Sequence, residues 1–260
     1  MQSAAPPDLS DTPYRLLERT AHGEFGSWRA VDEDGNRFVV KPTWTEDGVE
    51  ATELLRTDGV PVPRYVLLRA GLSVQEELPG MPLAGWEQLA PRTAERAIEL
   101  TEHFIGKRVS NAPPWPERIH SDVLVGHHYV DLPLLRRHAP DLLARCQRAV
   151  RVELDDPGDL VHWDYTTANI LAVEGEITGL VDWDGVCNGD RLFDLVTLFY
   201  YTRTPLLREY VLERTSERLF SAYLAAMIVR QTAFSLKFHD AAAGLRLIAD
   251  GLELSEAFPA

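Results

Sequence analysis

Four polar side chains lie close together in the sequence, in an order that would suit phosphoryl transfer. His162, Asp164 and Asn169 form an H-x-D-x-x-x-x-N pattern, and Asp182 follows after two short apolar runs. In phosphoryl transfer one carboxylate orients the attacking hydroxyl group, while an amide and a second carboxylate hold magnesium against the phosphates. We therefore expect Asp164 to be the catalytic residue, and Asn169 and Asp182 to bind the metal ion.

Two predicted strands would position these side chains. The apolar runs 169–173 and 177–181 flank a Glu-Gly pair and predict an antiparallel hairpin. Asp164 precedes the first strand and Asp182 ends the second, so the polar groups would converge at one end of a rigid ribbon. The alternative, a polar loop beside an ordinary hairpin, does not account for the matched positions.

Upstream, alternating apolar residues predict three antiparallel strands at 14–21, 27–31 and 37–41. The loop between the first two strands contains Gly23 and Gly26. Asp34-Gly35-Asn36, between the last two strands, is typical of a tight hairpin turn.

The third of these strands ends at Lys41, one of only three lysines in a chain whose usual cation is arginine. A compact ammonium group suits contact with phosphate oxygens, and a surface lysine is the alternative. The segment 45–57 predicts a helix, on which Glu50 or Glu53 could reach back to Lys41 or remain in solvent.

The order of these features resembles that of protein-kinase-like enzymes, and within them the aminoglycoside phosphotransferase and choline kinase family. The resemblance rests on the pattern at 162–169, on the Val-Asp-Trp-Asp segment around Asp182 and on Gly-Val-Pro-Val-Pro at 59–63, and it extends from about Tyr14 onward. Trp163 departs from the His-Gly-Asp of the family. We expect this indole to change the packing of the loop, although it could also narrow the acceptor site.

The resemblance implies an α+β, two-lobed protein-kinase-like fold with nucleotide between the lobes. A mobile N-terminus (1–12) would precede a small antiparallel-sheet N-lobe (13–78) and a mostly helical C-lobe (79–260). In the C-lobe, periodic apolar residues predict helices at 92–107, 141–150, 192–201 and 212–227, a further segment through Phe238, and a helix at 241–252.

The resemblance also implies roles for individual residues. The glycine loop would cover the triphosphate, Lys41 would pair with Glu50, and backbone groups of Glu76 and Leu78 would bind adenine. The expected nucleotide-binding residues are Gly23, Gly26, Ser27, Lys41, Glu50, Glu76 and Leu78. Four more are expected to support the loop or meet the substrate: His162, Asp184, Asp190 and Asp194.

The acceptor site is less defined by the sequence. Trp163, Trp183 and Tyr165 crowd the predicted site, whereas Trp86 and Trp115 are expected in the core. Acidic candidates for binding substrate amines, which are equally well explained as solvated residues, are Glu217, Asp240, Asp250 and Glu253.

Composition limits the partners. The 260 residues are 45% hydrophobic and 25% charged, with a formal net charge of −14 at pH 7. This charge disfavours nucleic acid and anionic membranes as partners and favours a cationic small molecule. The alternative, an acidic surface that only aids solubility, explains the charge equally well. Two cysteines give no disulfide framework, and adjacent His127 and His128 give no metal motif. We find no membrane-length apolar run and no signal-peptide pattern, so we expect a cytoplasmic monomer or weak dimer.

The sequence therefore predicts an ATP- or GTP-dependent, Mg2+-requiring enzyme that phosphorylates a hydroxyl group of a small cationic molecule. An antibiotic of the aminoglycoside or cationic peptide type is favoured. Alternatives are a metabolic kinase of the choline, homoserine or sugar type and a non-catalytic kinase-like binding protein. A protein kinase is disfavoured because no Ala-Pro-Glu segment for peptide docking follows Asp182.

Overall fold

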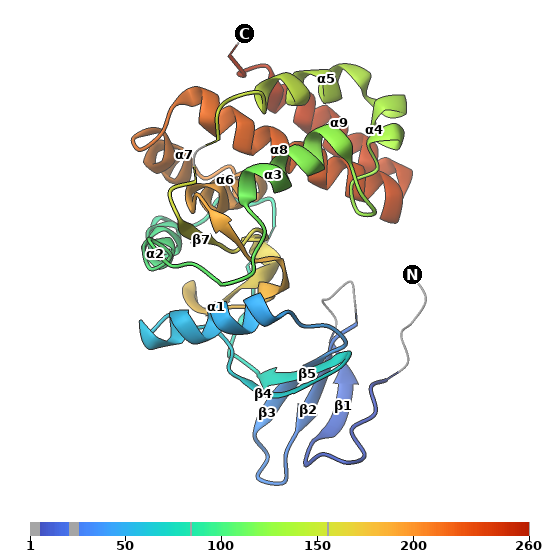
Figure 1. The fold of residues 1–260 in the computed structure, drawn as a ribbon, viewed down its shortest axis with the longest axis vertical. Coiled ribbons are helices and arrows are strands. Elements are labelled where there is room, and N and C mark those ends of the chain that lie inside the picture. Colours follow the sequence, from blue (N-terminus) through green and yellow to red (C-terminus); the bar gives the residue numbers. More distant parts are fainter. Residues whose placement is uncertain (1–5, 21–25, 84, 155, 260) are drawn as a thin grey trace.

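Alternating apolar residues in the first third of the chain form a five-stranded antiparallel sheet in this computed structural model, which describes residues 6–20, 26–83, 85–154 and 156–259. The strand order is β1-β2-β3-β5-β4 (Figure 1). The strands are β1 (Arg15–Arg19), β2 (Trp28–Val31), β3 (Arg37–Lys41), β4 (Tyr65–Arg69) and β5 (Leu72–Glu76). Apolar side chains of these strands form a small core of their own, which includes Ala30, Phe38, Val40 and Val74.

Helix α1 (Glu46–Thr57) lies in the chain between β3 and β4, two strands of this sheet. The Thr45 side chain caps it by accepting a hydrogen bond from the N–H of Gly48 at 3.0 Å. Gly48 also allows close packing, because a Cβ atom there would lie 2.8 Å from the carbonyl oxygen of Trp183. The helix therefore lies directly against the turn that follows Asp182.

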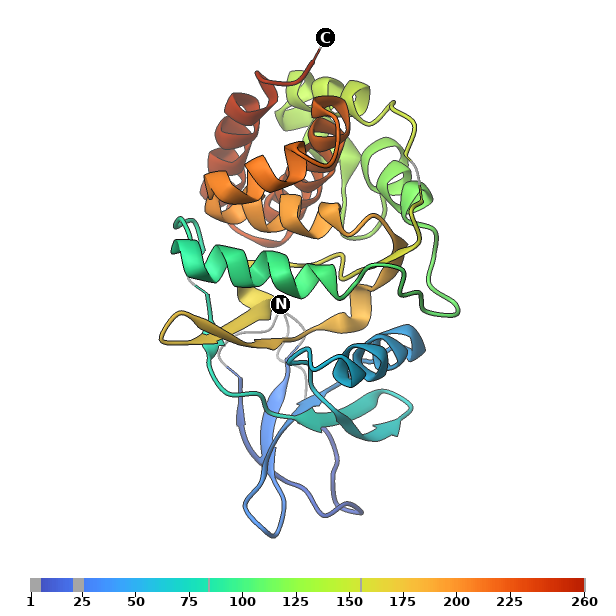
Figure 2. The same cartoon turned by 90° about the vertical axis from the view of Figure 1, so that its left-hand side faces the viewer.

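Beyond the sheet the chain is mainly helical, and Figures 1 and 2 show these helices on the side of the molecule away from the sheet. The helices are α2 (Pro91–Glu102), α3 (Trp115–His120), α4 (Leu132–His138), α5 (Pro140–Ala149), α6 (Leu192–Thr202), α7 (Pro205–Leu212), α8 (Glu217–Phe238) and α9 (Ala241–Ser255). A π-helical turn (Ser121–Val125) extends α3. Their apolar faces share one large core.

Two predicted helices have different ends in the structure. The helix predicted at 92–107 is α2, which ends at Glu102 because residues 103–106 form turns. The helix predicted at 212–227 and the segment after it are one continuous helix, α8. It begins after Ser216, whose side chain accepts a hydrogen bond from the N–H of Leu219 at 3.1 Å.

Short strands of the C-lobe lie between its helices and the five-stranded sheet (Figures 1 and 2). β6 (Met81–Pro82) pairs with β8 (Ile170–Val173), which forms the predicted hairpin with β9 (Glu176–Leu180), and β7 (Asp159–Val161) pairs with β10 (Cys187–Gly189). The hairpin turn has positive φ at both Glu174 (52°) and Gly175 (83°), as a type I′ turn requires. The predicted convergence of polar residues at one end of this hairpin follows from that pairing.

Helix α8 corrects the expectation that the chain holds no membrane-length apolar run. Its 22 residues include an 18-residue window of mean hydropathy 1.3. In the structure 72% of that window is buried among the other helices, as in the central helix of a packed core.

Candidate functional site

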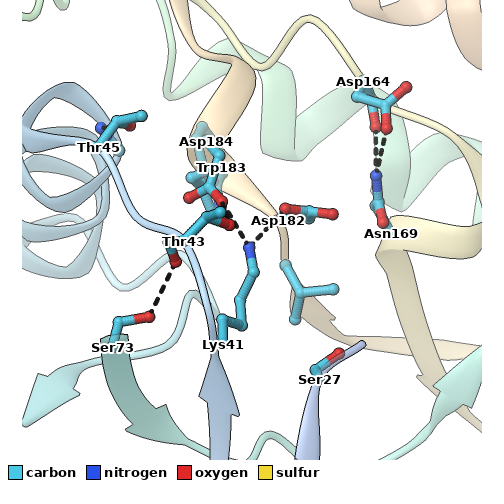
Figure 3. A network of polar contacts seen from close by, with 12 residues as sticks. Ser27, Lys41, Thr43, Thr45, Ser73, Asp164, Asn169, Asp182, Trp183 and Asp184 are labelled. Atoms are coloured by element: carbon cyan, nitrogen blue, oxygen red, sulfur yellow. Dashed lines mark hydrogen bonds and ion pairs between the residues drawn. The ribbon is translucent and has the colours of Figure 1, made fainter. Parts of the chain in front are cut away.

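The catalytic loop of the sequence prediction connects β7 to β8. Asp164 keeps 40% of its side chain exposed, whereas Asn169, at the end of the 3-10 turn Thr167–Asn169, is buried. The Asn169 Nδ2 donates hydrogen bonds to Oδ2 and to the carbonyl oxygen of Asp164, both at 2.9 Å (Figure 3). The amide therefore fixes the Asp164 carboxylate and leaves its own Oδ1 for another ligand.

Asp194, in the first turn of α6, supports this loop from inside the C-lobe. Its side chain is fully buried and accepts hydrogen bonds from the backbone N–H groups of His162 (2.8 Å) and Trp163 (3.0 Å). Burial raises the pKa of Asp194 to about 8, although the two N–H donors oppose this shift. The expected supporting contact of Asp194 is therefore present.

His162 connects the loop to the strand that leads to Asp182. Its Nε2 lies 3.0 Å from the carbonyl oxygen of Val181, and its Nδ1 lies 3.3 Å from the N–H of Asp164. Burial lowers the pKa of His162, which favours a neutral ring. A neutral ring with its proton on Nε2 satisfies both contacts. The ring of His162 therefore links the backbone at Asp164 to the backbone at Val181, the residue before Asp182.

Trp163 occupies a backbone conformation that normally favours glycine. Its φ is +73°, where a glycine residue would have no steric cost. The indole stacks on Phe193 with centroids 4.7 Å apart, and the guanidinium carbons of Arg118 and Arg230 lie 4.3 and 4.6 Å from the ring centroid. It is 3% exposed, so it changes the packing beneath the loop and does not narrow the acceptor side.

Lys41 faces two carboxylates from the turn after β9. Its Nζ lies 2.6 Å from Asp182 Oδ1 and 2.9 Å from Asp184 Oδ2, and the Thr43 hydroxyl also donates to Asp184 (Figure 3). Burial opposes the charged ammonium, but the two carboxylates outweigh it and hold the pKa of Lys41 above its ordinary value. Asp182 has φ +67°, a strained conformation of the kind that occurs at functional sites.

The expected ion pair between Lys41 and Glu50 is not formed. The Glu50 carboxylate accepts hydrogen bonds from the N–H (2.8 Å) and the hydroxyl group (2.9 Å) of Ser110, in the loop after α2. Glu53 is exposed on the same helix. The ammonium group of Lys41 instead forms its ion pairs with the C-lobe carboxylates of Asp182 and Asp184.

The carboxylate oxygens beside Lys41 and the amide oxygen of Asn169 are the kind of ligand that suits a hard divalent cation. Oδ1 of Asp184 is buried without a hydrogen-bond partner, and Asn169 Oδ1 is not used by the two bonds that its nitrogen donates. Carboxylate and amide oxygens are the ligands that Mg2+ prefers. No cluster of three or more His, Cys, Asp or Glu side chains that could hold a metal is found among the described residues, so an ion here would also need ligands from a bound phosphate.

The glycine loop is only partly described. Gly23 lies outside the described residues, whereas Gly26 has φ +77°, and a Cβ atom there would lie 3.0 Å from the Arg19 guanidinium group. The carbonyl oxygen of Ser27 accepts a hydrogen bond from the N–H of Thr20 at 2.9 Å, which closes the base of the loop. Gly26 and Ser27 therefore lie at the point where the chain enters β2.

The predicted hinge follows β5. The N–H of Glu76 donates to the carbonyl oxygen of Arg64 at 2.9 Å, so its carbonyl group is the part left for a nucleotide. Leu78 packs over β9, where a Cβ atom on Gly179 would lie 2.9 Å from its Cδ1. Both residues remain predictions as adenine ligands.

Asp190 does not face an acceptor. The Tyr223 hydroxyl donates to its Oδ2 at 2.6 Å and the N–H of Leu192 to its Oδ1 at 2.9 Å. Burial raises the pKa of Asp190. It therefore joins α8 to the start of α6.

The aromatic residues differ from expectation. Those predicted to crowd the site are all buried: Trp163, Trp183 and Tyr165. Trp115 is buried as expected, but Trp86 is 55% exposed, and its ring lies 5.9 Å from that of Tyr200 and 5.5 Å from that of Tyr201. The core assignment of Trp86 was wrong because no periodic pattern surrounds it in the loop before α2.

The acidic residues proposed for amine binding have other partners or remain in solvent. Asp240 caps α9 by accepting from the N–H of Ala243 at 2.7 Å, and Asp250 pairs with Arg203. Glu217 and Glu253 are exposed on helices.

Arg230 is the main site residue that the sequence did not reveal. It comes from the middle of α8, and its Nη1 donates to the carbonyl oxygen of Trp163 at 3.0 Å while its Nε lies 3.3 Å from Asp122 Oδ2. Its Nη2 lies 4.0 Å from Asp164 Oδ1. No motif marks this arginine, since it is distant in sequence from the loop that it contacts.

Comparisons with known proteins agree with this fold and identify the family. A profile of the phosphotransferase enzyme family matches residues 28–227. No curated protein sequence matches the chain. Among solved structures, aminoglycoside phosphotransferase APH(4)-Ia is 16% identical, with a TM-score of 0.72 over 95% of this chain and 94% of its own.

Two further similar structures are a macrolide 2′-phosphotransferase and an amicoumacin kinase. MphH from Brachybacterium faecium is 18% identical, with a TM-score of 0.57 over 94% of this chain and 93% of its own. The amicoumacin kinase hAmiN is 16% identical, with a TM-score of 0.61 over 95% and 89%. These similarities confirm the predicted two-lobed kinase-like fold.

Proposed function

We propose that this chain, which belongs to the phosphotransferase enzyme family, transfers the γ-phosphoryl group of ATP or GTP to a hydroxyl group of a cationic small molecule. The observation that carries the proposal is the Asp164–Asn169 pair, held at the end of a hairpin whose other strand leads to the Lys41–Asp182 contact. An exposed, oriented carboxylate beside a phosphate-binding lysine is the arrangement that phosphoryl transfer requires.

In the proposed reaction the acceptor oxygen attacks the γ-phosphorus and the bond to the β,γ-bridging oxygen breaks, releasing the nucleoside diphosphate. Asp164 orients the hydroxyl group and takes its proton. Asn169 fixes the rotamer of that carboxylate through its amide nitrogen. Lys41 stabilises charge on the phosphate oxygens, so positioning and charge neutralisation supply most of the rate enhancement.

Mg2+ would be held by Asn169 and Asp182, with Asp184 as a third oxygen donor, and would neutralise phosphate charge during transfer. The ammonium group of Lys41 forms ion pairs with the carboxylates of Asp182 and Asp184, the same groups that would hold the metal ion. Binding of Mg-nucleotide would then redistribute these contacts, with Lys41 moving toward phosphate oxygens.

The proposed acceptor is an antibiotic with one or more amino groups. Two observations support this class: the net charge of −14, and the similarity to structures described as binding hygromycin B and amicoumacin. A metabolic amino alcohol such as choline is the second candidate, but the aromatic residues nearest Asp164 are buried and offer no cage for a quaternary ammonium group.

A non-catalytic binding protein is disfavoured because Asp164, Asn169, Asp182 and Lys41 all retain side chains capable of the reaction. We further propose that the chain acts in the cytoplasm, where ATP and GTP are available, as a monomer or weak dimer.

The test is nucleotide turnover by the purified protein with Mg-ATP and Mg-GTP against aminoglycosides, cationic peptides, macrolides, choline and simple amino alcohols. We expect turnover that depends on one acceptor and falls by roughly three orders of magnitude or more in Asp164→Ala. Acceptor-dependent turnover that persists in a correctly folded Asp164→Ala variant would reject the role of Asp164. Failure to bind either nucleotide would reject the proposed function.

A further inference from the structure

The C-lobe contains a basic depression of about 540 Å³ at its far end from the N-lobe. Figure 1 shows α5 and the C-terminal end of the chain on the side of the C-lobe opposite the sheet. The polar lining residues used below are Arg145, Arg148, Arg151, Arg218, Ser221 and Ser255. This depression shares no residue with the site between the lobes.

Its charge contrasts with that of the whole molecule. The lining contains four arginines and a single carboxylate, Glu256, in a chain with a net charge of −14. Within the described ranges, no Asp or Glu side chain lies within 4.0 Å of any of these four guanidinium groups. By contrast, eleven of the other 19 arginines form ion pairs with carboxylates of described residues, so the charge of this cluster is poorly balanced.

The interaction of a cation with a helix dipole explains the positions of only some of these arginines. Arg148 lies in the last turn of α5 and Arg151 just beyond it, where cations stabilise the helix end. Arg218, however, is the second residue of α8, at the end of the helix where a cation is unfavourable. Bringing Arg218 toward the other arginines adds like-charge repulsion, which an anion in the depression would remove.

The floor of the depression offers hydroxyl groups. Ser221 and Ser255 are both buried. The Ser255 hydroxyl group donates to the carbonyl oxygen of Leu252 at 2.9 Å and accepts from Arg145 Nη1 at 3.5 Å, so it orients Arg145 and leaves Ser221 as the hydroxyl donor for a ligand. Arg148 and Arg218 are both exposed residues at the edge of the depression. Guanidinium groups pair with phosphate oxygens in a planar, two-point geometry, and a serine hydroxyl group adds a neutral donor.

We propose that this depression, formed by α5, α8, α9 and the C-terminal segment, binds a multiply charged phosphate-type anion. The ligand bridges the arginines of α5 to Arg218 of α8 and replaces the missing carboxylates. The site is separate from the proposed nucleotide site and does not depend on the proposed catalytic activity.

The test is calorimetric titration of the full chain with inorganic pyrophosphate, without magnesium, at about 50 and about 300 mM NaCl to vary charge screening. The double variant Arg148→Gln/Arg218→Gln removes two guanidinium groups from the depression. Arg136→Gln/Arg137→Gln is the matched control, because it makes the same charge change on exposed arginines of α4 that do not line the depression. Lys41→Met removes pyrophosphate binding that belongs to the nucleotide site.

We expect pyrophosphate binding that weakens with salt, persists in Lys41→Met and in the α4 control, and falls at least about tenfold in the Arg148/Arg218 variant, since charged hydrogen bonds are lost. Thermal unfolding of each variant confirms that it is folded. Equal pyrophosphate affinity in the two double variants would overturn the proposal, as would binding that disappears in Lys41→Met. Loss of kinase activity alone would bear only on the proposed function.

Discussion

The guanidinium group of Arg230 lies 4.0 Å from the carboxylate of Asp164, although the two residues come from different elements of the C-lobe. Arg230 is held by Asp122 and by the carbonyl oxygen of Trp163, so its position is fixed from both sides. The catalytic loop itself has no cation between Asp164 and Asn169. Helix α8 therefore supplies positive charge that the local sequence lacks.

Replacement of Arg230 by Gln should lower kcat by about 10- to 100-fold, because Asp164 loses a positioning contact. Nucleotide affinity should change little, since Arg230 does not contact the Lys41 side of the site. Arg118→Gln is the control. Arg118 contacts the same indole, but its guanidinium group donates to the carbonyl oxygen of Gly185 and forms no ion pair with Asp164. Steady-state kinetics of both variants provide the measurement, and equal losses in kcat would assign the effect to packing around Trp163.

At most positions an alanine variant is more stable than a glycine variant, and at Trp163 we expect the opposite order of stability. Both Trp163→Gly and Trp163→Ala lose a buried indole and should be destabilised by about 3–5 kcal/mol. Alanine keeps a Cβ atom at φ +73°, so Trp163→Ala should be less stable than Trp163→Gly by about 1 kcal/mol. Urea denaturation measures both.

The control pair is Trp183→Gly and Trp183→Ala. Trp183 is equally buried but does not have a positive φ, so its alanine variant should be the more stable one. The same order at both tryptophans would mean that the backbone at Trp163 is not strained.

The elements around the site could be predicted from the sequence because local patterns specify them. The hairpin of β8 and β9 has alternating residues and a two-residue turn, and β3 ends at Lys41 as expected. The kinase-like fold followed from the order of these motifs. The family membership agrees with that prediction.

Contacts between distant segments could not be predicted. The carboxylate of Glu50 lies on the expected helix, but its partner, Ser110, comes from a loop whose position depends on the packing of α2. Arg230 reaches Asp164 only because α8 runs beneath the catalytic loop. Pairings of this kind depend on tertiary packing, which helical periodicity in one segment does not encode.

Removal of Lys41 should make the protein more responsive to magnesium. In Lys41→Met the carboxylates of Asp182 and Asp184 lose their common cation and repel each other. Mg2+ should then raise the thermal unfolding midpoint of the variant by about 2–4 °C more than that of the wild type. Turnover should fall by about 100-fold or more, because phosphate charge is less well neutralised.

Lys107→Met is the matched control for that experiment. Lys107 also forms an ion pair, with Asp58 at 2.6 Å, but it lies outside the site. Its loss should leave the response to Mg2+ unchanged. An identical Mg2+ shift in wild type, Lys41→Met and Lys107→Met would contradict a metal site at Asp182.

Asp194 should make folding stability fall as the pH rises. Its pKa is raised by burial from an ordinary 3.8 to about 8 in the folded protein. The unfolded chain therefore releases this proton near pH 4, whereas the folded chain retains it until about pH 8. Stabilisation from this group is complete below about pH 4 and is lost progressively as the pH approaches 8.

The measurement is the free energy of unfolding of wild type and Asp194→Asn by urea denaturation from pH 5 to pH 8.5. The advantage of wild type over Asp194→Asn should shrink with rising pH by about 1 kcal/mol or more, since each pKa unit corresponds to about 1.4 kcal/mol. His162, whose pKa is lowered by burial, has the opposite effect and destabilises the fold as the pH falls below its ordinary value of 6.5. Because both proteins contain His162, its contribution largely cancels in the difference. A difference that stays constant across this range would show that the Asp194 carboxyl group is already ionised in the folded protein at pH 5.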